Sequence, residues 1–190
     1  LYCIRIIMFR RSLFDVPIFI VPVGDWQNQK SAFLDRMDWS DTDCQLEHCW
    51  TDYHKFFRAG RMPDYFDHLM AILDLPMQIF QRENPGAYVN SAWCQRYSKN
   101  SQYHPAHTHG AIGWSSVFYA QLGYGHKPTA FISPITDPWS GHIDEAFPNV
   151  KEGDMIFFPS YLIHQSLPHN SNEDKIIFSM NFVKSPETIY

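Results

Sequence analysis

Residues 153–164 read GDMIFFPSYLIH, and residues 175–183 read KIIFSMNFV. Both stretches are short runs of aromatic, Ile and Met residues, and Gly, Asn or Asp residues precede each of them. Such runs, bounded by turn-forming residues, are typical of β-strands. They predict a sheet in the C-terminal part of the chain, with His164 close behind one of its strands.

Similar runs recur throughout the second half of the chain, and each is expected to be a strand. The expected strands are Tyr88–Ser98, Trp114–Leu122, Thr129–Ile132, Asp154–Pro159 and Lys175–Val183. Nearer the N-terminus, Val16–Val23 contains two prolines, which suit an edge strand. In contrast, Pro134–Gly153 has no clear period and predicts a long loop, a feature that is often functional in a compact domain.

Apolar residues at helical spacing characterise the first half of the chain. They predict helices over Asn28–Asp38 and Pro63–Arg82, the second of them kinked or divided at Pro76. The polar stretch Asp38–Arg61 is expected to be mostly loop, and the acidic side chains of Asp35–Asp52 are expected to be solvated. Helices followed by short strands indicate an α+β fold whose sheets form a sandwich or barrel.

The composition favours one domain with a large core. The chain has 190 residues, 45% of them hydrophobic, and a formal net charge of −5. We expect a single domain over residues 8–190, with Met8 as the candidate start, helical support in 28–83 and a barrel core in 86–184. No segment carries the basic excess of a protein that binds duplex nucleic acid, and no stretch is long enough to span a membrane. A cytoplasmic location is expected, or the host cytoplasm if a phage encodes the chain; the oligomeric state stays open.

The cysteines are scattered and form no CxxC pair. They are Cys3, Cys44, Cys49 and Cys94. This pattern predicts reduced thiols rather than a zinc or redox motif, although a Cys44–Cys49 bridge stays open for an oxidising compartment.

The sequence HPAHTH contains His104, His107 and His109. Residues two apart on a strand share a face, so His107 and His109 can direct both imidazoles to one point, and His164 can add a third nitrogen. Three ligands with open positions beside them suit Fe(II). His104 falls on the opposite face of such a strand and is assigned to the substrate or to a supporting role. The alternative for the whole cluster is a polar loop of hydrated histidines.

Other aromatic and histidine residues are expected to have ordinary structural roles. Trp93 and Trp114 are expected in the core. His126, His142 and His169 lie in loop-like settings and are expected to be solvated.

Two blocks of sequence together resemble a known family. Trp93–Tyr119 (WCQRYSKNSQYHPAHTHGAIGWSSVFY) and Gly153–Phe182 (GDMIFFPSYLIHQSLPHNSNEDKIIFSMNF) resemble the 2-oxoglutarate/Fe(II) oxygenase family that is common in bacteriophages and marine bacteria. The shared pattern is His-x-His, Ser-x-Val-x-Tyr, then Gly-Asp, Phe-Pro-Ser, a His, a basic residue and a strand ending in Asn-Phe. Phe14–Ile18 resembles the opening strand of that family, so the resemblance covers roughly residues 8–184.

The resemblance implies a double-stranded β-helix, a cupin-like jelly roll with the metal at its mouth and N-terminal helices packed on one sheet. It implies that His107 and His164 are metal ligands. His109 stands where the wider superfamily usually has Asp or Glu, so a third ligand from His109 would leave the metal with a higher net charge.

The resemblance also implies 2-oxoglutarate as cosubstrate, whose far carboxylate needs a cation deep in the barrel. Lys175 is in the matching position, where most relatives are expected to have Arg. Tyr119, Ser179 and Asn181 are further candidates for contacts with this cosubstrate, because alternation places Ser179 and Asn181 on the face of Lys175. The alternatives are a solvent-exposed lysine and a core tyrosine.

The resulting hypothesis is a 2-oxoglutarate-dependent Fe(II) dioxygenase that hydroxylates an unknown substrate. Trp139, within Pro134–Gly153, is a candidate substrate contact, and this segment is expected either to shape substrate entry or to be a surface loop without a role. A three-histidine cupin-type dioxygenase without 2-oxoglutarate stays open. So does a non-enzymatic jelly-roll module, such as a phage structural or binding protein.

Overall fold

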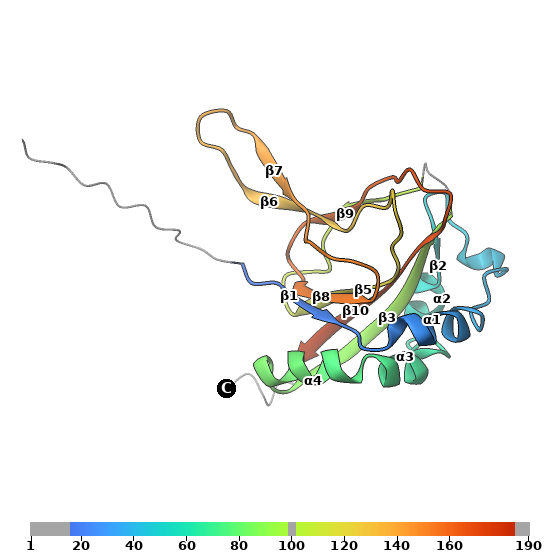
Figure 1. The fold of residues 1–190 in the computed structure, drawn as a ribbon. Coiled ribbons are helices and arrows are strands. Elements are labelled where there is room, and N and C mark those ends of the chain that lie inside the picture. The colour runs from blue at the N-terminus through green and yellow to red at the C-terminus, as the bar shows by residue number, and fades with distance from the viewer. Residues whose placement is uncertain (1–15, 99–101, 185–190) are drawn as a thin grey trace, which may run out of the picture.

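The computed structural model describes residues 16–98 and 102–184. The expected domain start at residue 8 therefore lies outside the described residues, as do Cys3 and positions 14 and 15 of the expected opening strand. Within the described part, the chain forms helices in its first half and strands mostly in its second, which agrees with the α+β class (Figure 1).

Two antiparallel sheets form the body of the protein. The larger sheet has six strands in the order β1-β8-β5-β10-β3-β2, and the smaller has four in the order β4-β9-β6-β7. The strands of the larger sheet are β1 (Phe19–Pro22), β2 (Trp50–Thr51), β3 (Ala87–Tyr97), β5 (Trp114–Gln121), β8 (Asp154–Pro159) and β10 (Lys175–Lys184). Those of the smaller are β4 (His104–His107), β6 (Ala130–Thr136), β7 (Ile143–Ala146) and β9 (His164–Ser166). The proline-containing strand β1 lies at a sheet edge, as expected.

The central strands of the larger sheet are buried on both faces. Successive residues of a strand point to opposite faces, so these apolar runs supply two cores at once. Phe118, Phe157 and Phe178 pack into the core on the helical side. Their neighbours in sequence, including Val117 and Ile177, pack into the second core, which also contains Phe131 of the smaller sheet.

The helices cover one face of the larger sheet, and the smaller sheet lies on the other side (Figure 1). They are α1 (Trp26–Leu34), α2 (Tyr53–Arg58), α3 (Phe66–Ile72) and α4 (Asp74–Glu83). Phe80 of α4 stacks on Phe157 of β8, with ring centroids 4.4 Å apart and the planes nearly parallel. This aromatic stack fixes the end of the helical layer to the sheet.

The long helix expected over Pro63–Arg82 is divided, but not at Pro76. The break falls at Leu73, and Pro76 is the third residue of α4. The first residues of a helix need no intrahelical hydrogen bond from their N–H groups, so a proline fits in the first turn. The proline therefore lies in the first turn of a new helix, which begins two residues before it at Asp74.

Asp38–Arg61 is mostly loop, as expected, but it also contains short regular elements, and the expectation that the acidic side chains of Asp35–Asp52 are solvated is wrong for Asp52. The segment contains a 3₁₀ turn (Thr42–Cys44), strand β2 and helix α2. Asp52 is only 2% exposed, because its carboxylate accepts hydrogen bonds from the Cys94 backbone N–H of β3 and from the Tyr65 hydroxyl. Cys94 lies 42 residues away from Asp52 in the sequence, so the local composition gives no sign of this contact.

Pro134–Gly153 also differs from the expected loop. Strands β6 and β7 form a hairpin that projects from the body of the molecule (Figure 1). Every residue of β7 is exposed, which is why the stretch shows no apolar period.

Cys44, Cys49 and Cys94 are buried free thiols, so Cys44 and Cys49 form no bridge. Burial raises the pKa of both Cys44 and Cys49 to about 12, which keeps them protonated. In the part of the chain that the structure describes, no helix is long and apolar enough to cross a membrane.

The Phe80 stack predicts a large loss of stability on truncation. Phe80→Ala should lower the free energy of unfolding by about 3–5 kcal/mol, because it leaves a cavity between α4 and β8. Urea denaturation followed by circular dichroism measures the loss. Leu75→Ala, on the same helix but 54% exposed, is the matched control and should change stability by less than about 0.5 kcal/mol. Equal effects of the two substitutions would show that α4 does not anchor the sheet.

Candidate metal centre

Backbone pairing in the smaller sheet brings distant histidines together. His107 of β4 lies directly opposite His164 of β9, and His164 in turn lies opposite Phe131 of β6. His109 follows the end of β4, where its N–H donates to the Ser160 carbonyl at 2.9 Å. Thus HPAHTH and the segment before His164 are held side by side by main-chain hydrogen bonds.

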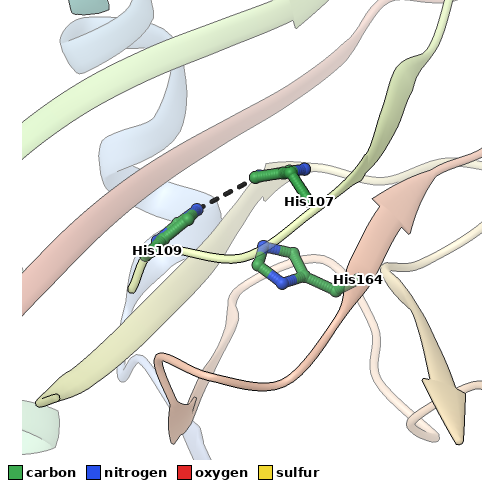
Figure 2. A group of neighbouring side chains, drawn as sticks. All are labelled: His107, His109 and His164. Carbon is green, nitrogen blue, oxygen red and sulfur yellow. Dashed lines mark hydrogen bonds between the residues drawn. The ribbon is translucent and has the colours of Figure 1, made fainter. Parts of the chain in front are cut away.

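The imidazoles of His107, His109 and His164 converge (Figure 2). One potential ligand nitrogen from each ring lies within 4.8 Å of the other two. The Nε2 atoms of His107 and His109 are 3.1 Å apart. With metal–nitrogen bonds of about 2.1 Å, that separation corresponds to an angle of about 95° at a shared ion, close to the right angle between neighbouring octahedral positions.

Each ring of this triad has its Nδ1 atom beside an oxygen acceptor. Nδ1 of His107 is 2.7 Å from the Pro105 carbonyl, that of His164 is 2.9 Å from the Leu162 carbonyl, and that of His109 is 2.7 Å from Asn181 Oδ1. We therefore assign the proton to Nδ1 in each ring, which leaves the lone pair on Nε2. Lone pairs 3.1 Å apart on His107 and His109 repel each other, and a cation held by both would remove this repulsion.

The surroundings keep these histidines neutral. Burial lowers the pKa of His164 to about 3 and that of His109 to about 4, and it also lowers the pKa of His107. Neutral imidazole is the form that ligates metals. The group contains no carboxylate, so among the described residues the donor set is three neutral nitrogens.

The expectation that His104 faces away from His107 is wrong. A register irregularity between His104 and His107 interrupts the alternation of β4. As a result the Nδ1 atoms of the two residues lie 3.0 Å apart. Bulges of this kind redirect a side chain, and the spacing of residues alone does not reveal them. His104 therefore contacts the Nδ1 atom of His107 and leaves the Nε2 atom of His107 free to face the triad.

Lys175 is fully buried, so it is not the solvent-exposed lysine of the alternative interpretation. Its Nζ donates to the Lys127 carbonyl at 2.6 Å and to Ser166 Oγ at 2.9 Å. It makes no ion pair with a described carboxylate, and burial lowers its pKa to about 7. A buried ammonium without a counter-ion is costly and is retained where an anion completes it.

A small cavity adjoins the triad, and Ser166, whose hydroxyl accepts from Lys175 Nζ, is one of the residues that line it. Tyr97, Thr129, Ser166 and Ser179 line it together with all three histidines, and we call it the inner cavity. Its volume is about 20 Å³, which is enough for roughly one water molecule. The buried hydroxyl of Tyr97 has no hydrogen-bond partner among the described residues. The Lys175 ammonium donates to Ser166 and lies 5.4 Å from the centre of the Tyr97 ring, and both of these residues line the inner cavity.

The other residues singled out from the sequence have varied positions. Ser179 lines the inner cavity. Asn181 contacts His109, and its amide nitrogen donates to Ser91 Oγ at 3.1 Å. Tyr119 is buried behind the cavity and donates to Thr129 Oγ1 at 3.0 Å. Trp139 is 95% exposed at the tip of the β6–β7 hairpin. It lines neither the inner cavity nor a larger second cavity that adjoins His107 and His109.

The structure agrees with some of the remaining histidine and tryptophan predictions and differs from others. His169 is buried rather than solvated, and its ring packs 4.6 Å from that of His126. His142 is exposed, as expected. Trp93 is buried, and Trp114 is partly buried against the helical-side core.

Sequence reasoning missed Tyr97 and Gln95 as site residues, although a signal was present. Alternate residues Trp93, Gln95 and Tyr97 of β3 all face the cavities beside the histidines. Once β3 is recognised as a strand, its period of two places these three side chains on one face.

Residues 91–181, just under half of the chain, match the sequence profile of a family described as "Putative 2OG-Fe(II) oxygenase". The matched segment contains the three histidines and Lys175. The description names the two cofactors that the sequence predicts, iron and 2-oxoglutarate. None of the curated proteins matches the chain by sequence.

Several solved structures share the fold. The non-heme alpha ketoglutarate dependent epimerase SnoN from nogalamycin biosynthesis aligns with a TM-score of 0.60 at 10% identity, over 89% of this chain and 78% of its own. HygX from Streptomyces hygroscopicus, solved with nickel and 2-oxoglutarate, gives 0.60 at 12% identity, over 90% and 84%. A Pseudomonas putida prolyl-4-hydroxylase gives 0.55 at 13% identity, over 90% and 94%.

Identities this low show a common fold and leave the activity of this chain open. The chain spans only 51% and 52% of the length of two further 2-oxoglutarate-related structures, with TM-scores of 0.43 and 0.41.

Loss of one imidazole should abolish tight metal binding. His164→Ala should weaken Fe(II) or Zn(II) affinity by at least about 100-fold, because two ligands remain. Asn181→Ala should weaken it by about 10–100-fold, since His109 loses the acceptor that orients its ring. Anaerobic isothermal titration calorimetry measures both. His142→Ala, on the exposed hairpin, should bind metal like the unaltered protein; a similar loss there would argue against the triad.

Proposed function

We propose that the chain is a 2-oxoglutarate-dependent Fe(II) oxygenase that hydroxylates a substrate while 2-oxoglutarate is converted to succinate and CO₂. The observation that carries the proposal is the position of the unpaired, buried Lys175 behind a convergent histidine triad. The family match over residues 91–181 supports the same reaction class. We interpret the two antiparallel sheets as the two halves of a double-stranded β-helix.

The residues present fit a divalent metal. Three neutral nitrogens, with Nδ1 protons bound elsewhere, form one face of a site and leave the opposite positions open. When bound there, Fe(II) supplies the activation of O₂ that couples oxidation of 2-oxoglutarate to oxidation of a C–H bond. The chain itself supplies ligands, orientation and exclusion of water.

The residues around the inner cavity fit the far carboxylate of 2-oxoglutarate. Lys175 would provide the positive charge, and the unpartnered Tyr97 hydroxyl would donate a hydrogen bond. Ser166 Oγ, which accepts from Lys175, would hold the ammonium in place. Because the cavity holds only about 20 Å³, binding requires the side chains that line it to move apart.

The absence of a carboxylate among the three ligands favours one second candidate. A three-histidine dioxygenase that needs no 2-oxoglutarate would use the same triad, and in it Lys175 would have no ligand to neutralise. The two candidates therefore differ in whether 2-oxoglutarate is bound and consumed.

Measuring the turnover of 2-oxoglutarate distinguishes the two candidate functions. With Fe(II), ascorbate and O₂, the protein should convert 2-oxoglutarate to succinate, measured by mass spectrometry. Lys175→Met should raise the dissociation constant for 2-oxoglutarate by at least about 100-fold, since the buried carboxylate loses its partner. Lys184→Met, at the exposed end of the same strand, is the control and should bind normally. Substrate oxidation without 2-oxoglutarate would instead establish the second candidate.

The affinity for 2-oxoglutarate should also depend on pH. Free Lys175 has a pKa of about 7 because of burial, and a bound carboxylate would raise it. Above pH 7 binding must therefore take up a proton, so affinity should be greatest below pH 7 and decrease as the pH rises. Calorimetry between about pH 6 and 9 measures this slope. Lys175→Arg stays charged over this range, so its affinity for 2-oxoglutarate should not depend on pH. The same dependence of affinity on pH in that variant would assign the titration to another group.

A further inference from the structure

A second and larger cavity also adjoins the triad. It has a volume of about 300 Å³ and shares His107 and His109 with the inner cavity, whereas His164 lines only the inner one. We call it the outer cavity. Besides the histidines and Thr108, its lining residues are Leu46, Thr51, Tyr53, His54, Trp93, Gln95 and Asn181. The volume is at the lower end of the range for small-molecule sites.

The outer cavity has no charged wall. Among the described residues that line it, none is Asp, Glu, Lys or Arg. Asp52 lies between the lining residues Thr51 and Tyr53 but is not part of the lining. Its carboxylate instead accepts hydrogen bonds from the Cys94 backbone N–H and the Tyr65 hydroxyl. A charged group that entered the outer cavity would lose its hydration without gaining a counter-ion.

Aromatic rings line the outer cavity beside the metal centre. The Trp93 ring lies 5.3 Å from that of His109, and Tyr53 packs edge-to-face against Trp93 at 5.0 Å. Phe57 stacks behind Tyr53 at 4.9 Å and supports it from outside. Trp93 is buried and Tyr53 is partly exposed, so Tyr53 offers the accessible ring. Such rings bind planar or apolar groups by stacking and edge contacts.

We propose that the outer cavity binds the primary substrate, that this substrate is an uncharged ring-containing compound of small-molecule size, and that Tyr53 determines this specificity. The inference rests on the proposed function, because it takes the triad as the reaction centre. The two cavities then divide the ligands by charge: the anionic cosubstrate goes to the side of Lys175 and the neutral substrate to the side of Tyr53.

Three probes that share one ring and one chain length test the charge preference. They are indole-3-ethanol, which is neutral, indole-3-acetate, which is anionic, and tryptamine, which is cationic. Each is titrated by anaerobic calorimetry into protein saturated with Fe(II) and 2-oxoglutarate, so that a carboxylate cannot compete for the metal. Indole-3-ethanol should bind at least about tenfold more tightly than either charged probe.

Variants test the assignment to Tyr53. Tyr53→Ala should weaken indole-3-ethanol binding by about tenfold, and Tyr53→Phe, which keeps the ring, should bind within about twofold of the unaltered protein. Tyr88→Ala removes an exposed tyrosine outside both cavities and should have no effect. Metal and 2-oxoglutarate affinities are measured separately for each variant and should not change.

The outcomes separate the two proposals. If the unaltered protein binds neither Fe(II) nor 2-oxoglutarate, the proposed function fails and this inference fails with it. If both bind but a charged probe binds as tightly as the neutral one, or no probe binds, only the assignment of the outer cavity is wrong. Unchanged probe binding by Tyr53→Ala would likewise overturn the role of Tyr53.

Discussion

Burial of the larger sheet on both faces is the constraint on which the rest of the structure depends. Strands β5, β8 and β10 must cover apolar side chains above and below, so the protein needs a layer on each side. The helices provide one, through contacts such as Phe80 on Phe157. The smaller sheet provides the other, and it is this second layer that carries His107 and His164 opposite each other.

Polar side chains between the two sheets are mostly held by hydrogen bonds. Asn181 holds His109, and Ser166 holds Lys175. Each satisfied group fixes the position of a group that faces the space between the sheets. The exceptions are the Tyr97 hydroxyl, which has no partner, and the Lys175 ammonium, which has no counter-ion among the described residues. Tyr97 lines the inner cavity, and Lys175 contacts both Tyr97 and Ser166 of its lining. This is the physical basis for proposing an anionic ligand there.

The sequence indicated much of the framework but less of the site. Six strands could be predicted because they depend on local residue patterns. The histidine set could be predicted from its spacing together with the resemblance of the two sequence blocks to a known family. Three features of the site could not be predicted: the contacts of Asp52, the orientation of His104 towards His107 and the partners of Asn181. They depend on a neighbouring strand or on a strand irregularity, and neither leaves a periodic signal in the residues concerned.

By itself, the sequence determined the α+β class, the edge position of the proline-rich strand and the candidate metal ligands. Those features follow from residue type and order. Only the tertiary structure decided that Lys175 is buried without a counter-ion, that Tyr97 stands beside it, and that the cavity next to Tyr53 has no charged wall. The reason is that burial and the pairing of charges depend on which distant segments meet, and in this chain residues 50–53, β3 and β10 meet only through the larger sheet.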